Sequence, residues 1–454
     1  MKKIYYLRII CLLLLFSTLF CALSLSASAS SFEEALPDTS VAKNVYFANL
    51  ETGKVLLNKN PDTKIAPAST VKILTALIAI EHFSENLEQT IQVSDKIPLR
   101  YDGAYMGLLH GDEISAIDLI YATVCGGYND AAYALACAIS GDVPEFMKLM
   151  NKKLAALGAK SSYYTNPAGT DEAGMYTTLS DTSKLVKLAN QNETYMTVSS
   201  TSAHKISYRS GNKTETFTVN NRNALISGHY VAGYVNSYSN GIIAGMTNDA
   251  GYCVATKMKI NDATYLCIIM GASATDSSIG SFELATSLIR YARTSLAMAK
   301  VMSAKEVICE IPIDFALSKS SAEKKKATVS ARIDEDVFLF LPKSADLSTE
   351  ITYKYYLYSD TLTAPIFSGE RVGGVDFFYN GELVASTALI VSEDIAENEF
   401  LIKMENFKKA IFNRATIISA ILFSALLCSY LVLENKLFRR RTKKAFKITN
   451  SRKL

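Results

Sequence analysis

The order of apolar and polar positions divides the body of the chain into a mixed segment and a strand-rich segment. Over residues 36–300, short strand-like runs alternate with stretches of helical period. We expect one hairpin over residues 45–57, with a turn at Gly53, and another over residues 252–271. Helices are expected at 69–81, 116–121, 131–139, 179–190 and 282–297. Strands at both ends with helices between them predict an α+β domain, in which an antiparallel sheet packs against helices.

The next segment, residues 305–393, has little helical period and many β-branched and aromatic residues, which predicts a small all-β domain. Strands are expected at 337–341, 351–357, 372–379 and 382–391. The pair Asn380-Gly381 separates the last two strands and is typical of a type I′ hairpin turn.

The N-terminal end reads as a secretory signal over residues 1–29. Lys2, Lys3 and Arg8 precede a long apolar run, and small residues follow it just before Ser30. Basic, apolar and small-residue regions in this order predict a signal peptide that is cleaved. The alternative is an uncleaved membrane anchor.

The C-terminal end predicts membrane attachment. Residues 398–414 mix apolar side chains with lysines, as an interfacial helix does. Residues 415–433 carry no charge and are long enough to cross a bilayer. The tail at residues 434–454 is rich in Lys and Arg, which predicts that it is cytoplasmic. We therefore expect a protein of the cell membrane with a single C-terminal span and an extracytoplasmic body.

Composition narrows the possible partners. The chain has 47 basic and 44 acidic residues and a net charge of +3, which gives no case for nucleic-acid binding. Eight cysteines and four histidines are present, and their spacing does not suggest metal ligation. We expect no metal and no cofactor. Cysteines of the exported part are interpreted as small buried apolar residues.

The strongest chemical signal is the segment A-P-A-S-T-V-K-I-L-T-A-L at residues 66–77. Ser69 and Lys72 stand three apart where an apolar helix begins, so their side chains share one face. The lysine amine can then take the serine proton while the serine attacks a carbonyl. The alternative is an ordinary helix start with a solvated lysine.

This segment resembles the nucleophile motif of penicillin-binding proteins and serine β-lactamases, and its wording is most similar to that of serine D-alanyl-D-alanine carboxypeptidases. The similarity to that family extends over residues 36–393. It includes Y-D-G-A-Y-M-G-L at 101–108, N-D-A-A at 129–132, N-P-A-G at 166–169, Y-T-T at 176–178, and the segment 241–252. A β-rich unit followed by C-terminal membrane attachment is also the arrangement of these proteins.

The resemblance implies a β-lactamase/transpeptidase-like fold and a mechanism. Ser69 would attack the carbonyl between two D-alanines of a peptidoglycan stem peptide, with Lys72 as the base. Asn129 would hold Lys72 and the substrate backbone. The backbone N–H groups of Ser69 and Met246 would form the oxyanion hole. Stem peptides, and also β-lactams, are the implied ligands.

Two motifs depart from the family pattern. The family's S-x-N reads G-Y-N at residues 127–129, so the serine that relays a proton is a glycine. The K-T-G motif reads Ile243, Ala244 and Gly245, so two side chains that bind the substrate carboxylate are replaced. Gly245 still lets a ligand approach the backbone. Loss of one charge-assisted contact costs about 1.5–3 kcal/mol, and loss of a relay costs about 10²-fold in rate.

Several alternatives stay open. The chain is either a working carboxypeptidase or a weak or inactive member that serves as a cell-wall binding or scaffold module. A transpeptidase shares the same site. A β-lactamase needs a second base, for which no E-x-x-x-N segment is present. Asn129 could cap a helix, Cys125 could be a packing residue, and Arg222 or Lys257 could supply the missing cation.

Overall fold

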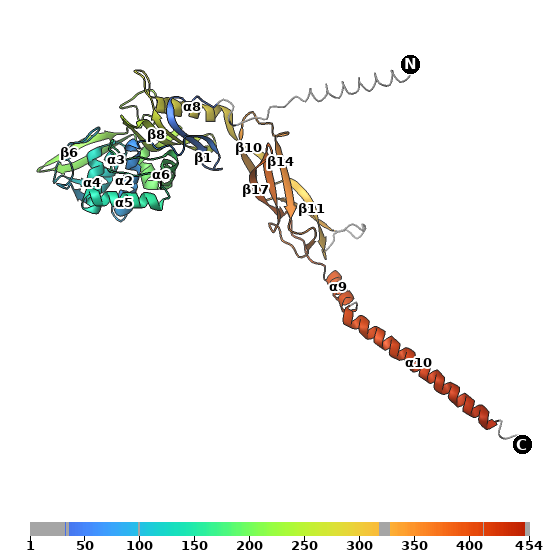
Figure 1. Cartoon of the computed structure of the whole chain (residues 1–454). Helices are drawn as coiled ribbons and strands as arrows, with labels where there is room; N and C mark the ends of the chain where they lie inside the picture. The colour runs from blue at the N-terminus through green and yellow to red at the C-terminus, as the bar shows by residue number, and fades with distance from the viewer. Residues whose placement is uncertain (1–31, 33–35, 99, 317–326, 412, 450–454) are drawn as a thin grey trace, which may run out of the picture. The chain divides into compact units, whose positions relative to one another are not determined.

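The structure is a computed structural model that describes residues 32, 36–98, 100–316, 327–411 and 413–449 (Figure 1). The signal segment expected at residues 1–29 lies outside these residues. The chain forms two units: the first runs to Ala299 and includes Phe338–Glu350, and the second contains Lys300–Val337 and Ile351 onward. Residues 338–350 belong to the first unit although they fall inside the span expected for the second domain.

The first unit is built on a five-stranded antiparallel sheet with the order β2-β1-β9-β8-β7. Its strands are β1 (Ala42–Asn49), β2 (Val55–Lys59), β7 (Ser239–Thr247), β8 (Gly251–Ile260) and β9 (Ala263–Ala272). The first and last segments of the unit therefore meet in one sheet. Strand β7 is an edge of this sheet, so one side of its backbone has no neighbouring strand.

Helices cover both faces of the sheet, which explains why the central strand β9 is apolar at nearly every position, with Thr264 as the exception. Leu266 and Ile268 belong to a core shared with the helices that follow β2, whereas Cys267 and Ile269 belong to a second core shared with α8. The helices are α2 (Val71–His82), α3 (Ala116–Val124), α4 (Asn129–Ser140), α5 (Val143–Ala156), α6 (Leu179–Gln191), α7 (Glu193–Ser200) and α8 (Gly280–Ser295). Alternate side chains of a strand point to opposite faces, so β9 fills both cores.

Helix α2 lies at the centre of the larger core. Every residue from Val71 to Ile80 is buried, as expected for a helix that is apolar on all sides. A second sheet, with the order β3-β4-β5-β6, lies in the same unit. It contains β3 (Thr90–Gln92), β4 (Glu113–Ser115), β5 (Ala203–Ser210) and β6 (Lys213–Asn220). Arg222, which lines the pocket described below, follows two residues after the end of β6.

The second unit is a six-stranded sheet with the order β14-β16-β17-β12-β11-β15. Its strands are β11 (Val307–Asp314), β12 (Thr328–Ile333), β14 (Ile351–Leu357), β15 (Leu362–Thr363), β16 (Arg371–Tyr379) and β17 (Glu382–Val391). Asn380 and Gly381 have φ angles of 48° and 82°, as a type I′ turn requires. Strands β10 (Leu296–Met302) and β13 (Val337–Pro342) form a separate two-stranded sheet.

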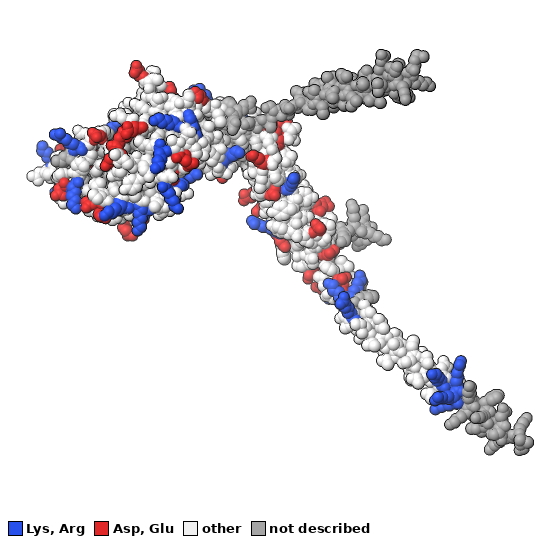
Figure 2. All heavy atoms as spheres, viewed as in Figure 1, with Lys and Arg blue, Asp and Glu red and all other residues white. Residues whose placement is uncertain are grey.

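Two helices end the second unit: α9 (Glu399–Ile411) and α10 (Arg414–Thr449). Among the described residues, α10 contains the one stretch long and apolar enough to cross a membrane, and its side chains are not buried in the protein. Figure 2 shows this uncharged stretch between two groups of basic side chains. The apolar helix fits membrane anchoring, whereas the interfacial role expected for α9 stays a prediction.

The predicted α+β class with a following all-β unit is confirmed. The two expected hairpins are β1–β2 and β8–β9, and the five expected helices are α2, α3, α4, α6 and α8. Helices α5 and α7 and the β5–β6 hairpin were not anticipated. The hairpin carries few apolar residues, and most of its side chains are exposed or half-buried, so its strands lack a clear apolar alternation.

Candidate active site

Ser69 lies in a single 3-10 turn, η1 (Ala68–Thr70), that leads into the buried helix α2. Pro67 precedes the turn, and the Thr70 hydroxyl donates a hydrogen bond to the Pro67 carbonyl at 2.6 Å. Ala68 adopts a left-handed conformation with φ of 49°, which is uncommon for a residue with a side chain. The turn holds Ser69 half-buried at the surface of the core while Val71 and the residues after it enter the core.

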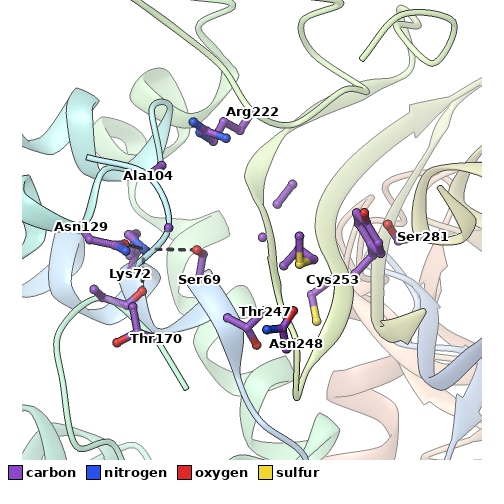
Figure 3. Close-up of a pocket in the computed structure, with 18 of the residues that line it drawn as sticks. Ser69, Lys72, Ala104, Asn129, Thr170, Arg222, Thr247, Asn248, Cys253 and Ser281 are labelled. Carbon is purple, nitrogen blue, oxygen red and sulfur yellow. Dashed lines mark hydrogen bonds between the residues drawn. The ribbon is translucent and has the colours of Figure 1, made fainter. Parts of the chain in front are cut away.

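Lys72 has only 1% of its surface exposed, and its amine is fully engaged. Its Nζ donates hydrogen bonds to Ser69 Oγ at 3.2 Å, to Asn129 Oδ1 at 2.7 Å and to the Ala168 carbonyl at 2.5 Å. Figure 3 shows Lys72 between Asn129 and Ser69. Three segments far apart in the sequence therefore meet at one amine.

The pKa of Lys72 is lowered to about 7 from its ordinary value of 10.5. Burial is the largest cause because it penalises the charged form, and the positive charge of Arg222 lowers the pKa further. The negative charge of Asp130 acts in the opposite direction. A lysine with such a pKa is partly neutral at physiological pH and can accept a proton.

Asn129 begins helix α4 and orients Lys72 from the other side. Its amide nitrogen donates to the Asp102 carbonyl at 2.5 Å, and its backbone N–H donates to the Ala104 carbonyl at 2.8 Å. The neighbouring Asp130 is fully buried and accepts four backbone N–H groups, those of Met106, Gly107, Leu108 and Ala131. Asn129 and Asp130 thus fix the loop at residues 102–108 against the start of α4.

A second loop presents the carbonyl that Lys72 contacts. Asn166 Oδ1 accepts the backbone N–H groups of Ala168, Gly169 and Thr170 and so folds this loop into a tight turn. Gly169 has φ of 77°, and a Cβ atom there would lie 1.9 Å from the Ala68 carbonyl oxygen. Only glycine lets this loop pack against the turn that carries Ser69.

Ser69 and Lys72 line a pocket of about 680 Å³. Strand β7 contributes Ala244, Gly245 and Met246 to the lining, but Ile243 is 3% exposed and belongs to the larger core. The strand therefore offers the pocket a methyl group, a bare backbone and the side chains of Met246 and Thr247, and no charge. Thr247 and Asn248 lie beyond Ser69 as seen from Lys72 (Figure 3).

Of the two candidate cations, the structure brings one to the pocket. Arg222 follows β6 and lines the pocket, and its Nε donates to the Gly126 carbonyl at 2.6 Å. Lys257 is half-buried in β8 and is not among the described residues that line it.

Cys125 is fully buried, and its thiol donates to the Val198 carbonyl at 3.0 Å. Burial raises the pKa of Cys125 to about 12, as expected for a packing residue.

The sequence analysis did not predict a role for some residues of the site. The Ala168 carbonyl is a backbone group, and no residue type identifies it. Asp130 and Asn166 stand in segments that resemble the family, but their work on neighbouring N–H groups depends on the folded loops. Tyr230 lines the pocket from the long connection before β7, and nothing in its local pattern indicated that.

Two family models match the chain. The family model described as D-alanyl-D-alanine carboxypeptidase matches residues 31–274. The model described as penicillin-binding protein 5, C-terminal domain, matches residues 300–397. The first match covers more than half of the chain and contains every residue of the site described above.

Curated relatives and solved structures give the same picture. The chain is 26% identical to the D-alanyl-D-alanine carboxypeptidase DacF of Bacillus subtilis, over 79% of this chain and 87% of that one. It is 25% identical to DacA of Haemophilus influenzae, over 83% and 90%. The structure of penicillin-binding protein 5 from Haemophilus influenzae superposes with a TM-score of 0.56 at 24% identity, over 80% of this chain and 99% of that one. The β-lactamase/transpeptidase-like fold that the resemblance implied is thus confirmed.

Proposed function

Since the chain belongs to the D-alanyl-D-alanine carboxypeptidase family, we propose that it acts on peptidoglycan through an acyl-enzyme at Ser69. One contact carries the proposal: Nζ of the buried Lys72 lies 3.2 Å from Ser69 Oγ in a pocket. An amine at this distance can take the hydroxyl proton as the serine attacks. The substrate class is that of the relatives named above, a peptide that ends in two D-alanines.

The proposed reaction has two halves. Ser69 Oγ attacks the carbonyl carbon of the penultimate D-alanine, and its proton passes to the neutral amine of Lys72. The C–N bond breaks, and the departing D-alanine takes that proton on its nitrogen. Water then adds to the ester, its proton returns through Lys72 to Ser69 Oγ, and the shortened peptide leaves as a carboxylic acid. The net reaction consumes one water and releases one D-alanine.

The negative charge that develops on the carbonyl oxygen needs donors. We assign this role to the backbone N–H groups of Ser69 and Met246. Two features support the assignment: Gly245 approaches Ser69 closely, and Met246 lines the pocket on the edge strand β7. Because residue 245 has no Cβ, the backbone of the strand can lie this close to the serine.

The terminal carboxylate of the substrate is assigned to Arg222. Ile243 points into the core and Ala244 offers only a methyl group, so β7 supplies no cation to the pocket. Arg222 lines the same pocket, and a guanidinium can bind a carboxylate with two parallel hydrogen bonds. Since Gly127 provides no hydroxyl, Lys72 also returns the proton to the leaving nitrogen in this proposal.

The test uses the full chain in detergent and two readouts. A fluorescent penicillin reports acylation of the serine, and release of D-alanine from a peptide ending in D-Ala-D-Ala reports turnover. We expect the wild type to be labelled and to release D-alanine, and Ser69→Ala to do neither. Ser84→Ala changes an exposed serine just after α2 and serves as the matched control. Wild-type protein with neither activity would overturn the hydrolase.

A second candidate function is a cell-wall binding or scaffold module. It is favoured by one observation, that neither residue 127 nor residues 243–244 offer the pocket a hydroxyl or a cation. Such a protein would bind the D-Ala-D-Ala peptide without releasing D-alanine. A binding titration of the wild type with the same peptide, added to the two readouts, separates the two functions, because peptide binding without D-alanine release supports the module.

We also propose how the chain is placed in the cell. Residues 1–29 are removed as a signal peptide, α10 crosses the membrane, and the basic tail from residue 434 stays in the cytoplasm. The uncharged stretch of α10 with basic residues after it supports this topology. In bacterial protoplasts, external protease should then digest the body and spare an epitope tag placed after Leu454. A digested tag would reverse the proposed orientation.

A further inference from the structure

Arg222 has unused hydrogen-bonding capacity at the pocket. Its backbone N–H donates to the Cys125 carbonyl at 2.9 Å and its Nε to the Gly126 carbonyl at 2.6 Å, so the side chain is tied to the segment before Gly127. Among the residues that the structure describes, no carboxylate pairs with it and no partner is found for its two Nη atoms. A guanidinium carries five N–H donors, so the four on the two Nη atoms have no partner among these residues, and Arg222 lines the pocket.

Two tyrosine rings flank this guanidinium. The central carbon of the Arg222 guanidinium lies 4.5 Å from the ring centre of Tyr230 and 6.0 Å from that of Tyr128. Tyr128 stands between Gly127 and Asn129, and Tyr230 belongs to the connection between β6 and β7. Only Tyr230 of the two rings lines the pocket, and it is 42% exposed.

The space that Arg222 occupies depends on Gly127. A Cβ atom at residue 127 would lie 3.0 Å from Arg222 Cδ, so a side chain there would compete with the present path of the arginine. Gly127 therefore costs the site a hydroxyl but leaves room for the Arg222 side chain. It lets the arginine run along the loop and present its guanidinium beside Tyr230.

We propose that Tyr230 is a positioning residue that holds the Arg222 guanidinium, through its ring face, in the orientation that binds the carboxylate of the acyl donor. The proposal rests on the proposed function of the pocket. An aromatic face attracts a guanidinium without neutralising its charge or occupying its N–H groups. A carboxylate in the same place would compete with the substrate for those groups. Tyr230 thus directs specificity towards ligands with a free C-terminal carboxylate.

The test measures binding, so it does not depend on turnover. The full chain with Ser69→Ala, in detergent, is titrated with diacetyl-L-lysyl-D-alanyl-D-alanine and with its C-terminal amide. Tyr230→Ala should weaken binding of the acid by about 3- to 30-fold, the range of a cation–π contact, and leave binding of the amide unchanged. Tyr230→Phe keeps the ring and should bind as the parent does. Val235→Ala changes an exposed residue of the same connection outside the pocket lining and is the matched control.

A second comparison asks whether Tyr230 acts through Arg222. In a chain that also carries Arg222→Gln, Tyr230→Ala should cause no further loss for the acid, because contacting residues are not additive. Three results for Tyr230→Ala would overturn the proposal. Its binding affinity could fall equally for acid and amide, or not fall at all. The full loss for the acid could also persist in the chain with Arg222→Gln. A parent that binds acid and amide alike would overturn the proposal as well. These outcomes are separate from failure of the hydrolase, which is recognised by the lack of acylation and D-alanine release in the wild type.

Discussion

Gly245 and Ser69 are packed so closely that no side chain fits between them. A Cβ atom on Gly245 would lie 2.5 Å from Ser69 Cβ, 2.9 Å from its Oγ and 3.0 Å from its backbone nitrogen. The backbone of an edge strand therefore passes directly over the nucleophile. Of residues 243–245, Gly245 is therefore the one that limits the space around the Ser69 side chain.

Gly245→Ala should slow acylation strongly while the protein stays folded. The added methyl group moves Ser69 or fills the space of the acyl carbon, and a displacement of about 1 Å can cost 10²-fold in rate. We expect the labelling rate with fluorescent penicillin to fall by about that factor or more. Gly228→Ala is the matched control, because its Cβ would make only an ordinary contact at 3.5 Å. A Gly245→Ala protein that labels at the wild-type rate would contradict the geometry.

Gly169→Ala should damage the turn that carries Ser69. The new Cβ would meet the Ala68 carbonyl oxygen at 1.9 Å, and the φ of 77° adds backbone strain. We expect a loss of stability of about 3 kcal/mol or more, seen as a lower midpoint in denaturant, together with lost labelling. Gly174→Ala has a similar φ of 86° and no atom within 4 Å, so it measures strain alone. Equal losses for both variants would show that the contact with Ala68 is unimportant.

Acylation should depend on pH through Lys72. Only the neutral amine accepts a proton, and the pKa of Lys72 is about 7, so the labelling rate should rise as pH passes through that value and then level off. Arg222→Gln removes a positive charge that lowers the pKa of Lys72. The midpoint should then move to higher pH. The rate should fall most near neutrality and least in alkaline buffer, as measured by labelling rates across the neutral range. An unmoved midpoint would exclude Arg222 as a cause.

Gly127→Ser restores the residue type of the family motif but should not improve the site. The residue has φ of 65°, and its new Cβ would lie 3.0 Å from Arg222 Cδ. We expect a stability loss of about 1–2 kcal/mol from the left-handed backbone and slower labelling because Arg222 must move. Gly127→Ala carries the same strain without a hydroxyl and is the control. If Gly127→Ser were labelled faster than the wild type, a serine hydroxyl at residue 127 would act as the proton relay, contrary to this prediction.

The position of the nucleophile could be predicted because it depends on local sequence. Pro67, the apolar run after Val71 and the three-residue spacing of Ser69 and Lys72 predict a helix start with both side chains on one face. Asn129 could be predicted only through the resemblance, since its partner Lys72 stands 57 residues away in the chain. The fold class could also be predicted, because the apolar pattern gave the order of strands and helices.

Other parts of the site depend on tertiary packing and have no local signal. Ile243 reads as an ordinary strand residue, and only the structure shows that its side chain is in the core and not in the pocket. Arg222 and Lys257 were equivalent in sequence, since both are basic residues far from Ser69. The loop after β6 turns one of them into the pocket, and β8 carries the other away from it.

The three hydrogen bonds of Lys72 decide how its proton loss affects the serine. Asn129 Oδ1 and the Ala168 carbonyl can only accept, whereas the Ser69 hydroxyl can accept or donate. The ammonium form has one N–H for each oxygen, but the neutral amine has one N–H fewer and a lone pair. Ser69 is then the one partner of the three that can reverse its bond. Deprotonation therefore points the lone pair at the serine, and the nucleophile is primed before a substrate arrives.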